Sequence, residues 1–197
     1  MASRGCHLVT RRAAFPGSFN PLTVGHLAVA EAARAQCALD MVDLIVSRVA
    51  LAKEDVQRPR IDDRVAVLRA AAAPRPWLGV VVTDHQLIAE VAEGYDVVVM
   101  GADKWAQILD PAFYSGSIEA RDAAVARLPT VAIAPRPPFD VPGGVVVLDV
   151  SHEASSTAVR DGRTDWMAPE AAEFDRVSGA WSDPERYDAW LQDRTRT

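Results

Sequence analysis

The chain has 197 residues, the length of one domain that can bury its own hydrophobic core. Its formal net charge of −6 argues against sequence-independent binding to nucleic acid, which requires a basic surface. No apolar run is long enough to cross a bilayer, and none follows the N-terminal arginines as it would in a signal peptide. The 2 cysteines lack metal-ligand spacing and suit a reducing compartment, so we expect a cytoplasmic protein that binds neither nucleic acid nor membrane.

Short β-rich apolar runs alternate with helical patterns along most of the chain. Strands are predicted over residues 8–15, 41–48, 77–84, 95–103, 130–136 and 144–150, and helices over 24–35, 62–74, 86–94 and 118–129. Asp62 or Asp63 is expected to cap the second helix, and Pro74 to end it. This alternation predicts βαβ units and a parallel sheet, hence a Rossmann-like doubly wound α/β fold with helices on both faces.

The last stretch of the chain, residues 164–197, has a different character. It holds Trp166, Trp181 and Trp190 and is rich in acidic residues. Two short helices are predicted, over 168–179 and 183–194, and we expect them to pack at the edge of the sheet. The sequence therefore predicts a Rossmann-like domain over residues 1–163 and a helical tail over 164–197 that packs on the same domain.

The predicted topology indicates where a ligand would bind. In doubly wound sheets, ligands bind at the carboxyl ends of the strands, where the strand order reverses. The segments that follow the first, fourth and sixth strands are "PGSFNPLTVGH", "GADKW" and "SHEASSTAVRDG". We expect these three segments to face one site.

The first segment has the features of a phosphate site. Gly17 and Ser18 offer backbone N–H groups in a tight turn, where a glycine lets a phosphate approach closely. The following helix starts near Thr23 to Gly25, and its unpaired N–H groups attract anions. His26 lies in the first turn, where it can donate a hydrogen bond to a phosphate oxygen, and Thr23 lies one turn before it. The alternative is a packed turn with a half-exposed histidine.

"GSFNPLTVGH" resembles the G-x-F-[DN]-P-x-[HT]-x-G-H signature of the nucleotidylyltransferase superfamily. Its members move a nucleoside monophosphate from a nucleoside triphosphate to a phosphate-bearing acceptor and release pyrophosphate. The resemblance implies catalytic roles for Thr23 and His26. It implies that Phe19 and Gly25 contact the nucleotide and that Asn20 contacts the substrate.

A second motif, "ASSTAVR", follows the sixth predicted strand. Ser155 or Ser156 can cap a short helix, Thr157 adds a hydroxyl, and Arg160 lies one turn on. Hydroxyls, backbone N–H groups and a guanidinium suit pyrophosphate, although a plainly capped surface helix has the same pattern. The segment resembles the superfamily's I-S-S-T-x-[IV]-R motif, with Ala154 in place of the aliphatic residue. The resemblance implies that these residues hold the β- and γ-phosphates and that Arg160 is catalytic.

Three further positions lie between the two motifs. Gly101 permits close approach of a ligand, and Asp103 can accept hydrogen bonds from ribose hydroxyls, as in the G-x-D segment of the mononucleotide adenylyltransferases. Trp105 can stack on a base or a nicotinate ring, or pack in the core. Lys53 follows the second predicted strand and either contacts phosphates or is solvated beside Glu54.

The resemblance also implies the reaction partners. These are ATP and a phosphorylated small-molecule acceptor, with Mg²⁺ bound mainly through the ATP phosphates and no dedicated protein metal site. The tail resembles that of nicotinate mononucleotide enzymes, although "DHQLIAEVAEG" replaces their Thr-rich segment. We therefore expect adenylyl transfer to nicotinate (or nicotinamide) mononucleotide. Alternatives are an adenylyl- or cytidylyltransferase for phosphopantetheine, a polyol phosphate or a sugar phosphate, and a non-catalytic nucleotide-binding protein. The base and the oligomeric state, including a homo-oligomer, stay open.

Overall fold

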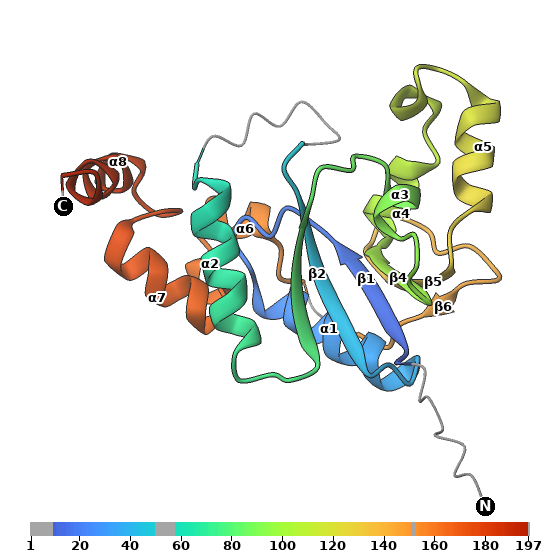
Figure 1. The fold of residues 1–197 in the computed structure, drawn as a ribbon, viewed down its shortest axis with the longest axis horizontal. Coiled ribbons are helices and arrows are strands. Elements are labelled where there is room, and N and C mark those ends of the chain that lie inside the picture. Colours follow the sequence, from blue (N-terminus) through green and yellow to red (C-terminus); the bar gives the residue numbers. More distant parts are fainter. Residues whose placement is uncertain (1–9, 50–57, 151–152, 197) are drawn as a thin grey trace, which may run out of the picture.

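The computed structural model describes residues 10–49, 58–150 and 153–196. Its centre is one sheet of parallel strands in the order β3-β2-β1-β4-β5-β6 (Figure 1). The strands are β1 (Arg12–Pro16), β2 (Met41–Ser47), β3 (Leu78–Thr83), β4 (Val97–Gly101), β5 (Thr130–Ala134) and β6 (Val146–Val147). The strand order reverses between β1 and β4. The predicted Rossmann-like α/β fold is confirmed.

Helices cover both faces of the sheet. They are α1 (Val24–Gln36), α2 (Ile61–Ala72), α3 (Ile88–Val91), α4 (Ala102–Ile108), α5 (Ile118–Ala126), α6 (Ser156–Arg160), α7 (Pro169–Ser178) and α8 (Pro184–Arg194), with short 3₁₀ turns η1 (Pro111–Tyr114) and η2 (Thr164–Trp166). Neighbouring residues of β1 point to opposite faces of the sheet and belong to different core layers. Phe15 packs in the layer that includes residues of α1 and α2, and Ala14 packs in the layer that includes residues of α3 and α4. None of the helices in the described ranges has the length and apolar character that a bilayer crossing requires.

Helix α2 starts differently from the sequence expectation. Its N-cap is Arg60, which makes no side-chain cap, so neither Asp62 nor Asp63 caps the helix. The Asp63 carboxylate instead accepts hydrogen bonds from the Tyr187 hydroxyl and from Arg194 of α8. Asp63 therefore bonds to the tail, although the sequence pattern predicted that it could cap α2.

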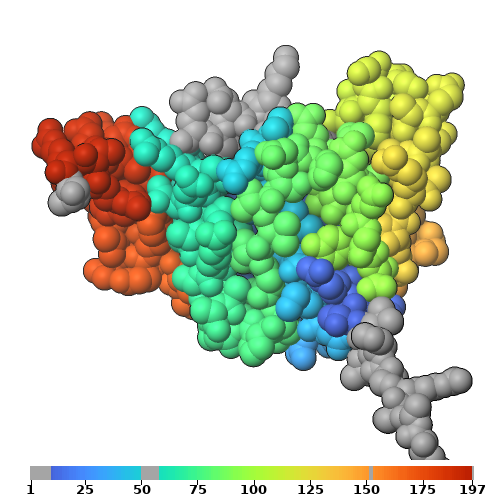
Figure 2. All heavy atoms as spheres, viewed as in Figure 1, coloured from blue at the N-terminus to red at the C-terminus, as the bar shows by residue number. Residues whose placement is uncertain are grey.

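The tail packs against α2, where the sequence suggested the sheet edge. Figure 1 shows α7 beside α2, and in the space-filling view of Figure 2 the tail, in red, lies against the teal segment that contains α2. The buried cluster that contains the strands also contains Ala171 of α7, Trp181 between α7 and α8, and Tyr187 of α8. The tail is therefore part of the main hydrophobic core.

Candidate active site

A cavity of about 1320 Å³ opens at the carboxyl ends of the strands, where the order reverses between β1 and β4. Its walls come from the segments after β1, β2, β4 and β5 and from α1, α2 and α6. Most of the residues singled out in the sequence line it: Gly17, Ser18, Phe19, Asn20, Gly25, His26, Gly101, Asp103, Ser156, Thr157 and Arg160. Thr23, Ser155 and Trp105 lie elsewhere, and Lys53 is outside the described residues. The volume exceeds that of a typical pocket for one drug-sized ligand, so two substrates can be accommodated.

Thr23 and His26 form a reciprocal cap at the start of α1. The backbone N–H of His26 donates to Thr23 Oγ1 (3.3 Å), and the backbone N–H of Thr23 donates to His26 Nδ1 (3.0 Å). Thr23 is fully buried and does not line the cavity within the described part of the chain. Its position is therefore suited to orienting His26, with no direct contact to a ligand.

This cap fixes the proton of the His26 ring. Because Nδ1 accepts from a backbone N–H, the ring proton of neutral His26 lies on Nε2. Burial and then the positive charge of Arg136 lower the pKa of His26 to about 4. The imidazole is therefore neutral at pH 7 and offers one N–H donor in the cavity wall.

The glycines of the first motif make room for packing. A Cβ on Gly17 would lie 2.9 Å from the ring of Phe19, which packs edge-on against His26 at 5.1 Å between centroids. A Cβ on Gly25 would lie 2.8 Å from the carbonyl oxygen of Ala154. Gly25 thus lets the start of α1 touch the segment that leads into α6.

The second motif is bonded to the first. Ser155 caps α6 by accepting the N–H of Ala158, so its hydroxyl is already engaged. Ser156 Oγ donates to the carbonyl of Pro21 at 2.8 Å. Arg160 donates from Nη1 to the carbonyl of Asn20 at 2.5 Å, and its Nη2 lies 3.4 Å from Thr157 Oγ1. Thr157 and Arg160 face the cavity.

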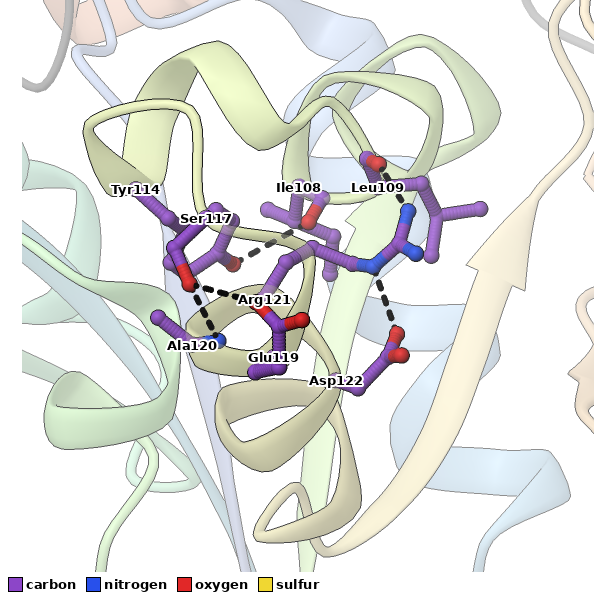
Figure 3. Close-up of polar contacts among 8 residues, drawn as sticks. All are labelled: Ile108, Leu109, Tyr114, Ser117, Glu119, Ala120, Arg121 and Asp122. Atoms are coloured by element: carbon purple, nitrogen blue, oxygen red, sulfur yellow. Dashed lines mark hydrogen bonds and ion pairs between the residues drawn. The ribbon is translucent and has the colours of Figure 1, made fainter.

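Among the described residues, Trp105 and the segment 108–117 do not line the cavity, whereas Gln107 between them does. Trp105 packs against the core layer under α3 and α4. Over residues 108–117 the polar contacts are internal: Arg121 Nη1 donates to the carbonyl of Leu109 (2.7 Å), and the Tyr114 hydroxyl donates to that of Ile108 (3.0 Å) (Figure 3). The Arg121 bond holds the segment to α5, and the Tyr114 bond lies within the segment.

Sequence reasoning missed three arginines in the cavity wall, Arg58, Arg64 and Arg136. Arg64, on α2, is 7% exposed and donates from Nη1 to the carbonyl of Ser18 at 2.8 Å. Its buried Nε has no hydrogen-bond partner among the described residues, and burial lowers its pKa. Arg136 follows β5, and its Nη1 lies 3.7 Å from Asp103 Oδ2. The available signal for Arg64 was a cation on the apolar face of "DDRVAVL".

Comparison with known families agrees with this geometry. The sequence profile of the family described as cytidylyltransferase-like matches residues 14–162, which include both motifs, strands β2 to β6 and most of β1. The chain belongs to the cytidylyltransferase-like family. A search among curated proteins found no match to the chain.

Membership of the cytidylyltransferase-like family assigns the chain to the nucleotidyltransferases. It implies a nucleoside triphosphate and a phosphorylated acceptor as substrates. The cavity of this cytidylyltransferase-like chain suits two anions, because Arg48, Arg64, Arg136 and Arg160 line it. The local positive charge of the cavity contrasts with the acidic balance of the whole chain.

Proposed function

We propose that this cytidylyltransferase-like protein transfers the adenylyl group of ATP to nicotinate (or nicotinamide) mononucleotide. An oxygen of the acceptor phosphate attacks the α-phosphorus, and a new phosphorus–oxygen bond forms. The bond from the α-phosphorus to the bridging oxygen breaks, and pyrophosphate leaves with that electron pair. The acceptor phosphate is already ionised, so no general base is required, and catalysis depends on alignment and charge neutralisation.

The observation that carries the proposal is the neutral, oriented imidazole of His26 in the cavity wall. With Nδ1 held by the backbone N–H of Thr23, the Nε2–H is the donor available to an α-phosphate oxygen. A donor that needs no reorganisation stabilises the charge that builds in the transition state. A pKa of about 4 keeps His26 in this donor form across the neutral range.

Arg160 and Thr157 are the groups that we assign to the leaving pyrophosphate. Both side chains line the cavity, and Arg160 is held by the carbonyl of Asn20. A guanidinium binds phosphate oxygens in pairs, which suits a leaving group of this kind. Helix α6 has only 5 residues, so we assign the binding to side chains, not to its helix dipole.

We further propose that Mg²⁺ is bound through the triphosphate. No cluster of three or more His, Cys, Asp or Glu side chains suited to a metal exists within residues 10–49, 58–150 and 153–196. Asp103, which lines the cavity, is within ion-pair distance of Arg136. This donor set fits a metal held by phosphate oxygens and water, where it would neutralise phosphate charge.

Support for the pyridine acceptor comes from the tail, whose sequence resembles that of nicotinate mononucleotide enzymes. One observation favours a second candidate. Trp105 is partly buried and packs against the core, and the segment 108–117 is held to α5, so neither offers an aromatic ring to the described cavity wall. A polyol or sugar phosphate needs no such ring, and cytidylyl or adenylyl transfer to one is the alternative.

Pyrophosphate release from the purified protein tests both candidates. ATP and CTP are each supplied with Mg²⁺ and with nicotinate mononucleotide, nicotinamide mononucleotide, phosphopantetheine, glycerol 3-phosphate or a sugar 1-phosphate. We expect release with ATP and nicotinate mononucleotide. Release only with another acceptor would reject the pyridine substrate and retain nucleotidyl transfer. No release with any pair, from protein that binds the nucleotides, would favour the non-catalytic alternative.

A further inference from the structure

A tryptophan of the tail contacts the first motif from behind. The indole Nε1–H of Trp181 donates to Asn20 Oδ1 at 2.6 Å, although 161 positions separate the two residues. Trp181 is 8% exposed and Asn20 is 5% exposed. An indole nitrogen is only a donor, so the atom that faces it must be the oxygen of the Asn20 amide.

The position of Trp181 is itself fixed by buried polar groups. The Asp175 carboxylate accepts the backbone N–H of Trp181 (2.7 Å) and that of Ser182 (3.0 Å). Gly179 ends α7 in the left-handed region, at φ 74°, which turns the chain back toward the first motif. Buried polar groups cost stability unless they are paired, and apolar packing would fill the same space without that cost. The arrangement therefore favours a positional role over a purely stabilising one.

Asn20 connects Trp181 to the cavity wall. Its side chain is held by Trp181, and its backbone carbonyl accepts from Arg160 Nη1 at 2.5 Å. Arg160 lines the cavity beside Thr157. A tail residue and a cavity guanidinium are thus joined through one buried asparagine.

We propose that Trp181 is a positioning residue for phosphate binding: through Asn20 it holds Arg160 in the orientation that binds pyrophosphate. This inference rests on the proposed function, since it takes Arg160 to be a phosphate ligand. It adds the tail to the site and gives Asn20 a role that needs no contact with substrate. It also predicts an effect on binding from a residue outside the family match, which ends at residue 162.

The first experiment is calorimetric titration of pyrophosphate, with Mg²⁺, into the full chain and two variants. Trp181→Phe keeps an aromatic ring and removes the N–H. Trp190→Phe is the matched control, because Trp190 packs on the same Phe174 ring as Trp181 but is not bonded to Asn20. We expect Trp181→Phe to weaken pyrophosphate binding about tenfold, the scale of one buried hydrogen bond, and Trp190→Phe to leave it unchanged. Equal affinity in both variants would overturn the proposal.

A second measurement does not depend on the variant's stability. The wild-type chain has 5 tryptophans, so a ¹⁵N–¹H spectrum resolves their indole resonances, assigned from backbone and side-chain correlations. We expect the Trp181 indole resonance to shift on saturation with pyrophosphate and the Trp190 resonance to stay. A Trp181 resonance that does not move would also overturn the proposal.

Pyrophosphate keeps this test separate from the identity of the acceptor, because every nucleotidyl transfer releases it. If nicotinate mononucleotide is not a substrate but Trp181→Phe binds pyrophosphate more weakly, the proposed acceptor is wrong and the positioning role stands. If nicotinate mononucleotide reacts and Trp181→Phe binds pyrophosphate normally, the proposed acceptor is correct and the positioning role is wrong. Failure of the wild-type chain to bind pyrophosphate at all would reject both.

Discussion

His26 is the residue on which the proposed chemistry depends most. Its Nδ1 is used by the cap of α1, which leaves a single tautomer for the neutral ring. One local motif therefore starts the helix and also sets the donor that faces the cavity. Replacing His26 also removes this hydrogen bond and lowers the stability of the chain. Activity and stability must therefore be measured together.

Replacing His26 with Gln should lower kcat for pyrophosphate release about 10²- to 10³-fold, the usual loss when one preorganised donor is removed. The fold should persist, since the lost cap costs about 1 kcal/mol. His85→Gln is the control, because His85 is exposed and lies outside the cavity lining. Wild-type turnover by His26→Gln, with ATP and the accepted acceptor, would contradict the assignment.

His26 also predicts a pH dependence of stability. Its pKa is about 4 in the folded chain against an ordinary 6.5, so between these values the unfolded chain binds a proton that the folded chain does not. The free energy of unfolding should therefore fall as the pH drops from 7 to 4, by a His26 contribution of roughly 1–3 kcal/mol. Denaturant unfolding at several pH values checks this. The stability advantage of wild type over His26→Gln should shrink on acidification and then reverse, and a constant difference would be incompatible with the lowered pKa.

Arg64 should show opposite effects on stability and binding. Its guanidinium is buried, and its Nε has no hydrogen-bond partner among the described residues, so Arg64→Met should leave the free energy of unfolding unchanged or raise it by up to about 1 kcal/mol. Pyrophosphate or nucleotide affinity should fall, because a cavity cation is lost. Arg69→Met, an exposed position on the same helix, is the control and should change neither. Marked destabilisation by Arg64→Met alone would assign that arginine to the fold.

At the scale of elements, the contact between the start of α1 and the segment before α6 joins the two motifs. Gly25 lies against the backbone of Ala154, and this contact needs the absence of a side chain at position 25. Ala154 is itself 3% exposed, so the contact is enclosed. The superfamily motif has an aliphatic residue at the position of Ala154, and that larger side chain would have to fit beside Gly25.

Gly25→Ala should destabilise the chain, although alanine favours a helix by up to about 1 kcal/mol. The added Cβ would lie 2.8 Å from a backbone oxygen that cannot rotate away, and overpacking of this kind costs about 1–3 kcal/mol, so the clash wins. Gly143→Ala is the control, since a Cβ there meets no atom of the described part of the chain within 4 Å. Denaturant midpoints decide the question, and a Gly25→Ala midpoint at or above wild type would show that the motifs can separate freely.

At the scale of the molecule, the tail belongs to the core although the family match ends before it. The match ends at residue 162, yet Met167, Trp181 and Tyr187 are buried with residues of the strands. The Tyr187 hydroxyl also accepts from the backbone N–H of Arg60 and donates to Asp63, which ties α8 to the start of α2. Burial raises the pKa of Tyr187 to about 12, so this donor stays protonated across the physiological range.

A chain that ends at residue 163 should therefore fail to fold stably, because the loss of several fully buried side chains costs more than a typical domain's margin of about 5–15 kcal/mol. A chain that ends at residue 194 is the control and should unfold like wild type. Circular dichroism and thermal unfolding compare the two. A cooperative transition near the wild-type Tm in the shorter chain would make the tail a separate appendage.

The strands and the edge of the sheet at which the cavity lies were predictable because their signals are local. Continuous apolar runs such as "DVVVM" mark strands buried on both faces, and the switch-point rule then places the loops. Helix α4 was missed because it follows β4 directly, with Gly101 as an N-cap that makes no side-chain bond. Strand β6 is shorter than expected, since only Val146 and Val147 pair with β5.

The missed contributions to the site depend on contacts distant in sequence. The one local signal for Arg64, a cation on the apolar face of its helix, is common in amphipathic helices and did not by itself indicate a cavity residue. Asp63 lies where a capping residue is expected, but its carboxylate accepts a hydrogen bond from Tyr187 of α8, 124 residues later in the chain. The hydrogen bond from Trp181 to Asn20 has no sequence signal that we can identify.

The 161-residue separation between Asn20 and Trp181 also bears on biosynthesis. A ribosome that adds about 5–20 residues per second needs roughly 10–30 seconds to make the chain between them. For most of that interval the nascent chain carries the first motif without Arg160 or the tail, which are made only near its end. A newly made chain thus carries its first motif without the buried residues that contact Asn20 in the folded protein, and a product of premature termination never acquires them.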